Sequence, residues 1–231
     1  MLTTNHNHIK HYNPPVYFKN QATRSYSHNI SVPLKTTSLD ALLNQDVVVL
    51  IDDENLQYSA KDLSYKVSYG SMKEKLKLIT NSCKLHTFFS SNSQINDRSK
   101  YFRKYGFVTH VKNIEYIPSF NGRTKKIANS DNFILFQAGA LITRSKAKVV
   151  IIASGDGQLV SDLSVCISKL PTKRDVFSMS LAGSTSHRLN ASNNRFIKGN
   201  IEIGQDFLRP IKNRSKTPFK HFAYNNHNLY N

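Results

Sequence analysis

Two continuous apolar segments dominate the hydrophobic pattern of the chain. Residues 47–51 (VVVLI) and 148–153 (KVVIIA) show almost no alternation between apolar and polar positions. Strands that are covered on both faces show this pattern, because both sets of side chains point into a core. The two segments therefore predict buried strands of a parallel sheet. Each ends abruptly in polar residues, DDEN after the first and SGDG after the second.

Shorter patterns predict helices and strands that alternate along the rest of the chain. Helices are predicted at residues 39–43, 55–63, 72–81, 95–105, 131–142, 158–170 and 184–191. Further strands are predicted at 85–90, 107–111, 175–180 and 195–198, and a polar connection at 113–128. Gly106 is expected to end the helix before it. The alternation predicts one three-layer α/β domain over residues 45–203, with a mainly parallel central sheet. Right-handed crossovers would bring the ends of the two apolar strands to one side of this sheet.

The two ends of the chain have a different composition. Residues 1–44 are rich in Asn, His, Ser, Thr and Lys, which predicts a disordered or loosely packed arm. Residues 204–231 form a basic tail, interpreted from Arg209 onward as disordered or as a short docking helix. Aromatic residues among basic ones in the first arm could stack on single-stranded RNA, although such arms are often only solvated. The arms could also carry contacts to a second copy or to a protein partner.

The net charge changes the expected class of partner. The 231 residues carry a formal charge of +17, which favours a polyanion, either nucleic acid or an anionic membrane surface. A merely soluble basic protein, or a charged surface used in assembly, would have the same composition. No segment has the eighteen or so consecutive apolar residues of a membrane span, so we expect no membrane insertion. Cys83 and Cys166 lie in apolar segments without CxxC spacing and are predicted to be buried, reduced and cytoplasmic.

Four acids fall at predicted strand ends or helix starts: Asp52, Asp131, Asp156 and Asp162. Carboxylates that gather in one cleft repel one another unless a cation lies among them. Hard oxygen ligands favour Mg²⁺ or Mn²⁺, so these acids are candidate metal ligands. The alternative is structural, because such residues also cap helices, shape turns or lie on solvated helix faces. The residue types alone leave both interpretations open.

Three sequence blocks resemble the NYN family within the PIN-like ribonucleases. They are VVVLIDDENL at residues 47–56, KKIANSDNFILFQAGALI at 125–142 and AKVVIIASGDGQLVSDL at 147–163. The segment HRLNASNNRFIKG at 187–199 is a weaker match to the family's last helix and strand. Together the blocks cover roughly residues 46 to 200, in the order and spacing that the family has.

The resemblance implies a PIN-like fold and a metal-dependent endoribonuclease that hydrolyses RNA phosphodiester bonds. It implies one or two Mg²⁺ or Mn²⁺ ions held by Asp52, Asp131 and Asp156. Asn55 would orient the first loop or a metal-bound water, and Ser154 would hold the turn or a ligand. The basic residues expected to hold RNA phosphates are Arg123, Lys125 and Lys126, with the basic runs at 73–77 and 98–104 and in the C-terminal tail.

Two positions depart from the family pattern. Gln158 stands where the family often has a second acid after Ser-Gly-Asp, and Gln137 stands where the middle helix often has another acid. Asp162 lies one helical turn beyond Gln158 and could substitute as a ligand, and Asp53 or Glu54 could also help. A weaker site would suit the alternative function, a catalytically weak or inactive RNA-binding or scaffold protein on the same fold. A nucleotide-binding module built on the SGDG turn is a third possibility, although the turn lacks the lysine of a P-loop.

Overall fold

The computed structural model describes residues 34–93, 96–118, 124–127, 130–184, 186, 189 and 194–211. For residues 117 and 124–127 it describes the backbone alone. The predicted arm up to residue 33 and the tail from residue 212 lie outside the described residues, as does most of the helix predicted at 184–191.

A six-stranded parallel sheet forms the centre of the domain, in the order β4-β3-β1-β7-β8-β9. Its strands are β1 (Asp46–Asp52), β3 (Ser82–Ser91), β4 (Val108–Asn113), β7 (Val149–Ala153), β8 (Asp175–Leu181) and β9 (Ile197–Ile203). The predicted parallel α/β architecture is confirmed, and each predicted strand is present. The two continuous apolar segments form β1 and β7, which pair directly with each other in the middle of the sheet.

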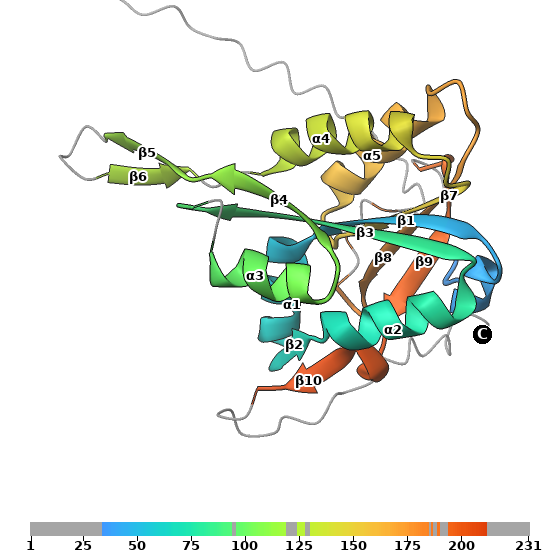
Figure 1. Cartoon of the computed structure of the whole chain (residues 1–231), viewed down its shortest axis with the longest axis horizontal. Coiled ribbons are helices and arrows are strands. Elements are labelled where there is room, and N and C mark those ends of the chain that lie inside the picture. The colour runs from blue at the N-terminus through green and yellow to red at the C-terminus, as the bar shows by residue number, and fades with distance from the viewer. Residues whose placement is uncertain are drawn as a thin grey trace, which may run out of the picture. The chain divides into compact units, whose positions relative to one another are not determined.

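Helices cover both faces of the sheet, which gives the three layers that the sequence predicts (Figure 1). They are α1 (Asp53–Asp62), α2 (Tyr69–Ile79), α3 (Asp97–Lys104), α4 (Asp131–Arg144) and α5 (Gly157–Ser168). Alternate residues of β1 serve two separate cores. Val49 packs with side chains of α1, α2 and α3, whereas Val48 and Leu50 pack with those of α4 and α5. This double burial explains why the strand has no polar alternation.

The order of the strands creates a switch point between β1 and β7. From β1 the chain moves outward to β3 and β4, and it then returns to place β7, β8 and β9 on the other side of β1. Ligands of open α/β sheets bind outside the carboxyl ends of the strands at such a reversal. Ile51 pairs with Ala153, so Asp52 and Ser154 lie level with each other at this edge.

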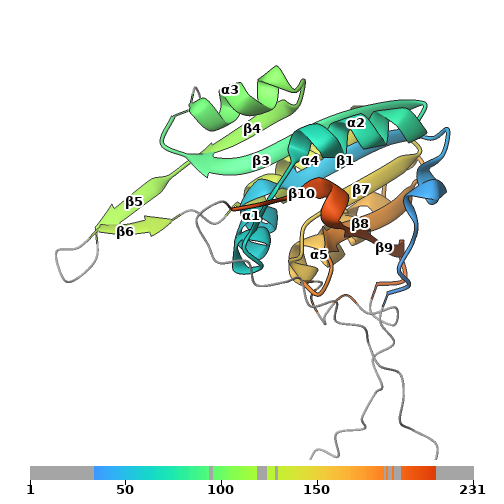
Figure 2. The ribbon, with the colours of Figure 1, turned by 90° about the horizontal axis from the view of Figure 1, so that it is seen from below.

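Two antiparallel pairs were not predicted. Residues 113–128, expected to be a polar connection, contain β5 (Glu115–Pro118) and β6 (Thr124–Ile127), which pair with each other. Figure 2 shows this pair extending beyond the end of β4. The second pair joins β2 (Tyr65–Val67) to β10 (Leu208–Pro210), which follows a 3₁₀ helix η2 (Gln205–Phe207). Phe207 is buried in the core, so the folded part continues past the predicted boundary at residue 203.

The segment before β1 is also ordered where it is described. It contains a 3₁₀ helix, η1 (Leu39–Leu42), at the predicted lead-in helix, and Thr36 forms a bridge to Asn200 of β9. Gly106 has a φ of +72° after α3, as expected for a residue that ends a helix. The prediction for Cys166 was wrong, because its side chain is exposed, and Cys83 is only partly buried. Within the described part of the chain, no helix has the length and apolar character needed to cross a membrane.

Candidate functional site

Asp52 lies at the carboxyl end of β1 and caps helix α1. Its carboxylate is only 6% exposed and accepts two hydrogen bonds. The backbone N–H of Asn55 donates to Oδ1 at 3.2 Å, and the hydroxyl of Ser154 donates to Oδ2 at 3.1 Å. The helix cap and the contact to the neighbouring strand therefore hold the carboxylate in one place at the switch point.

The loop after β7 is tied to the loop after β1 at two points. Ser154 is fully buried, and its Oγ accepts a hydrogen bond from the backbone N–H of Asp156 at 3.1 Å. Asn55 Oδ1 accepts a hydrogen bond from the backbone N–H of Gly155 at 2.6 Å. Asp156 caps α5, since its Oδ1 accepts from the N–H of Gln158 at 2.8 Å. We call Asp52, Asp131 and Asp156 the acidic rim.

The charges of the acidic rim affect one another. Burial raises the pKa of Asp52 to about 6, and the charge of Asp131 adds to this rise, while the hydrogen bonds from Asn55 and Ser154 oppose it. Asp131 is the first residue of α4, and burial raises its pKa as well. Asp156 raises that pKa further. The charge of Asp131 therefore couples to those of Asp52 and Asp156, as expected of carboxylates at a cation site.

The described side chains do not by themselves close around an ion. Among the residues that the structure describes, no group of three or more His, Cys, Asp or Glu side chains is arranged so that it could hold a metal ion. The oxygen donors still have the chemistry that a hard divalent cation requires. Burial is the main cause of the raised pKa values of Asp52 and Asp131, and the charges of neighbouring acids add to it. The donor set therefore fits Mg²⁺ or Mn²⁺ in kind.

The remaining predicted ligands take other partners. Both oxygens of Asp162 accept hydrogen bonds from Gln158 Nε2 at 3.0 Å, within the exposed face of α5. Gln137 is partly buried on α4. Asp53 is buried and pairs with Arg98, so it does not join the acidic rim. These two aspartates are engaged by neutral or cationic partners of their own.

The predicted phosphate-binding residues are only partly described. Arg123 lies outside the described residues, and Lys125 and Lys126 are placed by the backbone of β6 alone. One basic residue that the sequence did not single out acts on the acidic rim. Lys112, on β4, lowers the pKa of Asp131. Its position between an apolar strand and a polar loop gives no local signal for this role.

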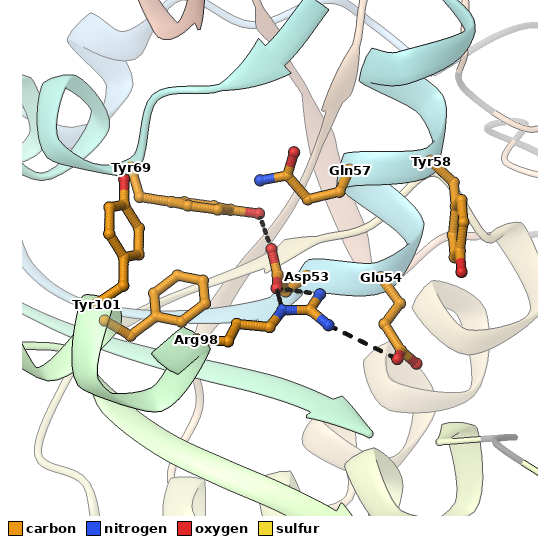
Figure 3. Close-up of a pocket in the computed structure, with 8 residues that line it drawn as sticks. Asp53, Glu54, Gln57, Tyr58, Tyr69, Arg98 and Tyr101 are labelled. Atoms are coloured by element: carbon orange, nitrogen blue, oxygen red, sulfur yellow. Dashed lines mark hydrogen bonds and ion pairs between the residues drawn. The ribbon is translucent and has the colours of Figure 1, made fainter. Parts of the chain in front are cut away.

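A pocket of about 420 Å³ lies on the other side of the start of α1, between α1, the first turn of α2 and α3 (Figure 3). Its polar lining comes from α1 and α3, and its aromatic lining from all three helices. The lining residues are Asp53, Glu54, Gln57, Tyr58, Tyr69, Arg98, Tyr101 and Phe102.

Three charged residues organise the floor of this pocket. The Arg98 guanidinium pairs with the buried carboxylate of Asp53, and one of its nitrogens lies 3.8 Å from Glu54 Oε1. The Tyr69 hydroxyl donates to Asp53 Oδ1 at 2.5 Å. Burial raises the pKa of Asp53, whereas Arg98 and Tyr69 oppose the rise. Arg98 also lies over the ring of Phe89, 4.7 Å from its centroid, which fixes the guanidinium in place.

The six-stranded parallel sheet with five helices is consistent with the fold of a PIN-like domain. The family model of the NYN domain matches residues 46–203, and the chain belongs to this family, which is one of PIN-like nucleases. Nucleases of this kind generally use divalent metals. No protein of curated function matches the sequence.

Two solved structures give further comparisons. A protein of unknown function from Vibrio parahaemolyticus is 18% identical, with a TM-score of 0.55 over 72% of this chain and 97% of that chain. It supports the fold alone. Ribokinase from Giardia lamblia is 10% identical, with a TM-score of 0.28 over 65% of this chain and 55% of that chain. That similarity is too low to support an argument about either fold or function.

Proposed function

We propose that the protein is a metal-dependent endoribonuclease that hydrolyses RNA phosphodiester bonds at the acidic rim. The observation that carries this proposal is the joining of Asp52 and Asp156 through Ser154, across the two strands that flank the switch point. Asp131 adds a third carboxylate whose charge is felt by Asp52. An acidic group of this kind is unexpected in a chain of charge +17 unless it serves a cation.

Each residue of the rim has a distinct part in the proposal. Asp52, Asp131 and Asp156 would hold Mg²⁺ or Mn²⁺ through their oxygens. A divalent cation bound there would supply a nucleophile by lowering the pKa of water and would stabilise charge on the phosphoryl oxygens. Asn55 and Ser154 are positioning residues, because their contacts hold the two loops together rather than pointing into solution. The full burial of Ser154 fits this role better than contact with RNA.

The substrate would be held by positive charge around the rim. Lys112 is near Asp131, and β5 and β6 follow β4 at the same edge of the sheet with Lys125 and Lys126 in β6. Arg123 and the terminal arms would add further phosphate contacts. Lysine and arginine side chains bind RNA backbones with an affinity that falls as salt rises. The arms are also where we propose any contact with a second copy or a protein partner, and the free thiols suit a reducing cytoplasm.

The test is cleavage of an end-labelled single-stranded RNA with Mg²⁺ or Mn²⁺, with and without EDTA. We expect EDTA, Asp52→Asn and Asp156→Asn each to reduce cleavage at least a hundredfold. Asp175→Asn is the matched control, because Asp175 lies at the opposite end of the sheet, where β8 begins, and pairs with the exposed Lys198 at 3.6 Å. Cleavage that persists in EDTA or in both rim variants would reject the metal mechanism.

One observation favours the alternative, an RNA-binding protein that does not cut. Gln158 replaces a family acid, and its amide holds Asp162, so the charge available to a cation at this loop is low. Under this alternative, RNA binding would weaken with salt while no cleavage occurred in either metal. Gln158→Asp then becomes informative, because it restores the family's Ser-Gly-Asp-x-Asp pattern. A gain of Mn²⁺ affinity in a calorimetric titration of this variant would show that the neutral amide limits the site.

A further inference from the structure

We propose that the pocket between α1, α2 and α3 binds one nucleobase of an RNA strand whose backbone runs over the acidic rim. This inference takes RNA as the substrate class from the proposed function, and it adds a second RNA-binding subsite beside the acidic rim. The base that fits best is guanine. The argument uses the position of the pocket, its charge and its aromatic lining.

The pocket and the rim share the start of one helix. Asp52 caps α1 on the side of β7, and the next two residues, Asp53 and Glu54, line the pocket. Gln57 and Tyr58 follow one helical turn later and extend the same lining. A nucleotide whose phosphate lies at Asp52 therefore has a neighbouring base within reach of the pocket. Figure 3 shows Tyr58 and Tyr101 on opposite sides of the pocket, with Asp53 and Arg98 between them.

The charge of the pocket disfavours an anionic ligand. Asp53 and Glu54 carry two negative charges against the single positive charge of Arg98, so a phosphate group would be repelled. A neutral base has no such penalty. The described contacts of Glu54 both fall on Oε1, which interacts with Arg98 and accepts from the N–H of Ser90 at 3.2 Å. Oε2 therefore keeps its capacity to accept hydrogen bonds.

Guanine matches these acceptors better than the other bases. It presents a ring N–H and an amino group side by side, and a carboxylate can accept from two adjacent donors at once. The amide of Gln57 is hydrogen-bonded to Asp53 and Tyr69, and its oxygen adds an acceptor at the same wall. Bases that are splayed out of a single strand are read in this way, by hydrogen bonds to their edges and stacking on aromatic side chains.

The aromatic residues at the mouth supply the stacking surface. Tyr58 is 67% exposed and Tyr101 is 42% exposed, while Phe102 and Tyr69 form the buried floor. Stacking of a base on an aromatic ring contributes about 1–3 kcal/mol. The net negative charge of the pocket would also suit a cationic side chain of a protein. The position of the pocket beside the acidic rim favours the base, and the titration below includes an arginine amide as the competing ligand.

The absence of tryptophan from the sequence provides a direct test. Tyr58→Trp places a single indole at the mouth of the pocket, and its fluorescence should be quenched when a base stacks on it. The full-length variant is titrated in EDTA with guanosine, with a short guanine-bearing RNA and with ribose 5-phosphate. The matched control is Phe136→Trp, because Phe136 is an equally exposed aromatic residue, 75% exposed, on α4 at the other face of the sheet.

We expect saturable quenching by guanosine and by the RNA, weaker quenching by uridine, and none by ribose 5-phosphate. Adding Tyr101→Ala to the reporter should weaken the affinity roughly tenfold or more. Gln57→Ala is a second variant that removes the amide without changing an aromatic side chain, and it should reduce the preference for guanosine over uridine. Circular dichroism confirms that each variant is folded.

Three results would overturn the inference. They are equal quenching of the Phe136→Trp control, quenching by ribose 5-phosphate, and quenching by an arginine amide but not by guanosine. The last would indicate a protein partner. Because the titration contains no metal, it is independent of cleavage. If guanosine quenches the Tyr58→Trp reporter but the original protein does not cleave RNA, the nuclease proposal alone is rejected. If the original protein cleaves RNA but guanosine does not quench the reporter, the proposal of a base-binding pocket alone is rejected.

Discussion

The side-chain oxygen of Asn55 accepts a hydrogen bond from the backbone N–H of Gly155 at 2.6 Å, although the two residues are separated by 100 positions in the chain. The contact joins the first turn of α1 to the loop that follows β7. It therefore fixes the distance between Asp52 and Asp156, the two acids that flank the switch point. The pairing of β1 with β7 brings the loops together, and this contact sets how they meet.

Asn55→Ala should loosen the acidic rim. Removal of one net hydrogen bond costs about 1 kcal/mol of folding free energy, and an unpaired backbone N–H at a partly buried site adds to that cost. We expect a loss of about 1–2 kcal/mol in urea unfolding and weaker binding of Mn²⁺ by titration. Asn81→Ala is the control, because Asn81 bonds Asp46 at the opposite end of β1. Equal loss of Mn²⁺ affinity in both variants would contradict the role given to Asn55.

Gly155→Ala should disturb the same contact by crowding. A Cβ at this position would lie 3.1 Å from Asn55 Oδ1 and 3.0 Å from the backbone oxygen of Ser184. Overpacking of this kind costs about 1–3 kcal/mol. Gly139→Ala is the matched control in α4, where nothing lies within 4 Å of the added carbon. Since alanine favours helix over glycine, this control should gain about 0.5–1 kcal/mol in urea unfolding. A neutral Gly155→Ala variant would show that the loop can move freely.

Arg98→Ala should destabilise the domain because it leaves the charge of Asp53 buried without its cation. Breaking a buried ion pair costs about 3–5 kcal/mol, and we expect about 2–3 kcal/mol here because the Arg98 side chain is 36% exposed. Arg98→Ala with Asp53→Asn should recover part of the loss. Lys100→Ala is the control, since its pair with Asp97 is exposed and contributes little. Urea unfolding of the three variants and the original protein measures each value, and equal losses for Arg98→Ala and Lys100→Ala would reject the argument.

The sequence predicts those parts of the fold whose hydrophobic pattern can be read within a single segment. The apolar runs of β1 and β7 are continuous because both faces of each strand are buried, and a single segment shows this. The position of Asp52 and Asp156 at one edge then follows from right-handed crossovers between parallel strands. The pairing of β2 with β10 gives no such signal, because the two short strands are far apart in the chain and are brought together by the folding of the domain around them.

The residues of the candidate site also divide into those that the sequence predicts and those that it does not. Asp52 and Asp156 were recognisable as acids that follow buried strands, whereas Asp53 was interpreted as a possible helper at the metal. The structure instead pairs Asp53 with Arg98 of α3, a contact that depends on how two helices pack. The pocket could not be predicted for that reason, since its residues come from three helices. The burial predicted for Cys166 is wrong because a helix in an apolar segment still has one exposed face, and Cys166 lies on it.

The pH dependence of stability tests the burial of Asp52. Burial raises its pKa in the folded protein to about 6 from 3.8, so the folded state binds more protons than the unfolded state between these values. Stability contributed by this group is therefore present at low pH and is lost as the pH rises from about 4 to about 6, by up to roughly 3 kcal/mol. Asp52→Asn removes the titration, so its stability relative to the original protein should rise over the same window. Urea unfolding at pH 4, 5, 6 and 7 measures the difference.

Asp46→Asn is the control and should show the opposite trend. Hydrogen bonds from Ser82 and Asn81 lower the pKa of Asp46, so the contribution of Asp46 to stability grows as the pH rises. A difference between Asp52→Asn and the original protein that did not change with pH would mean that Asp52 is hydrated in the folded state.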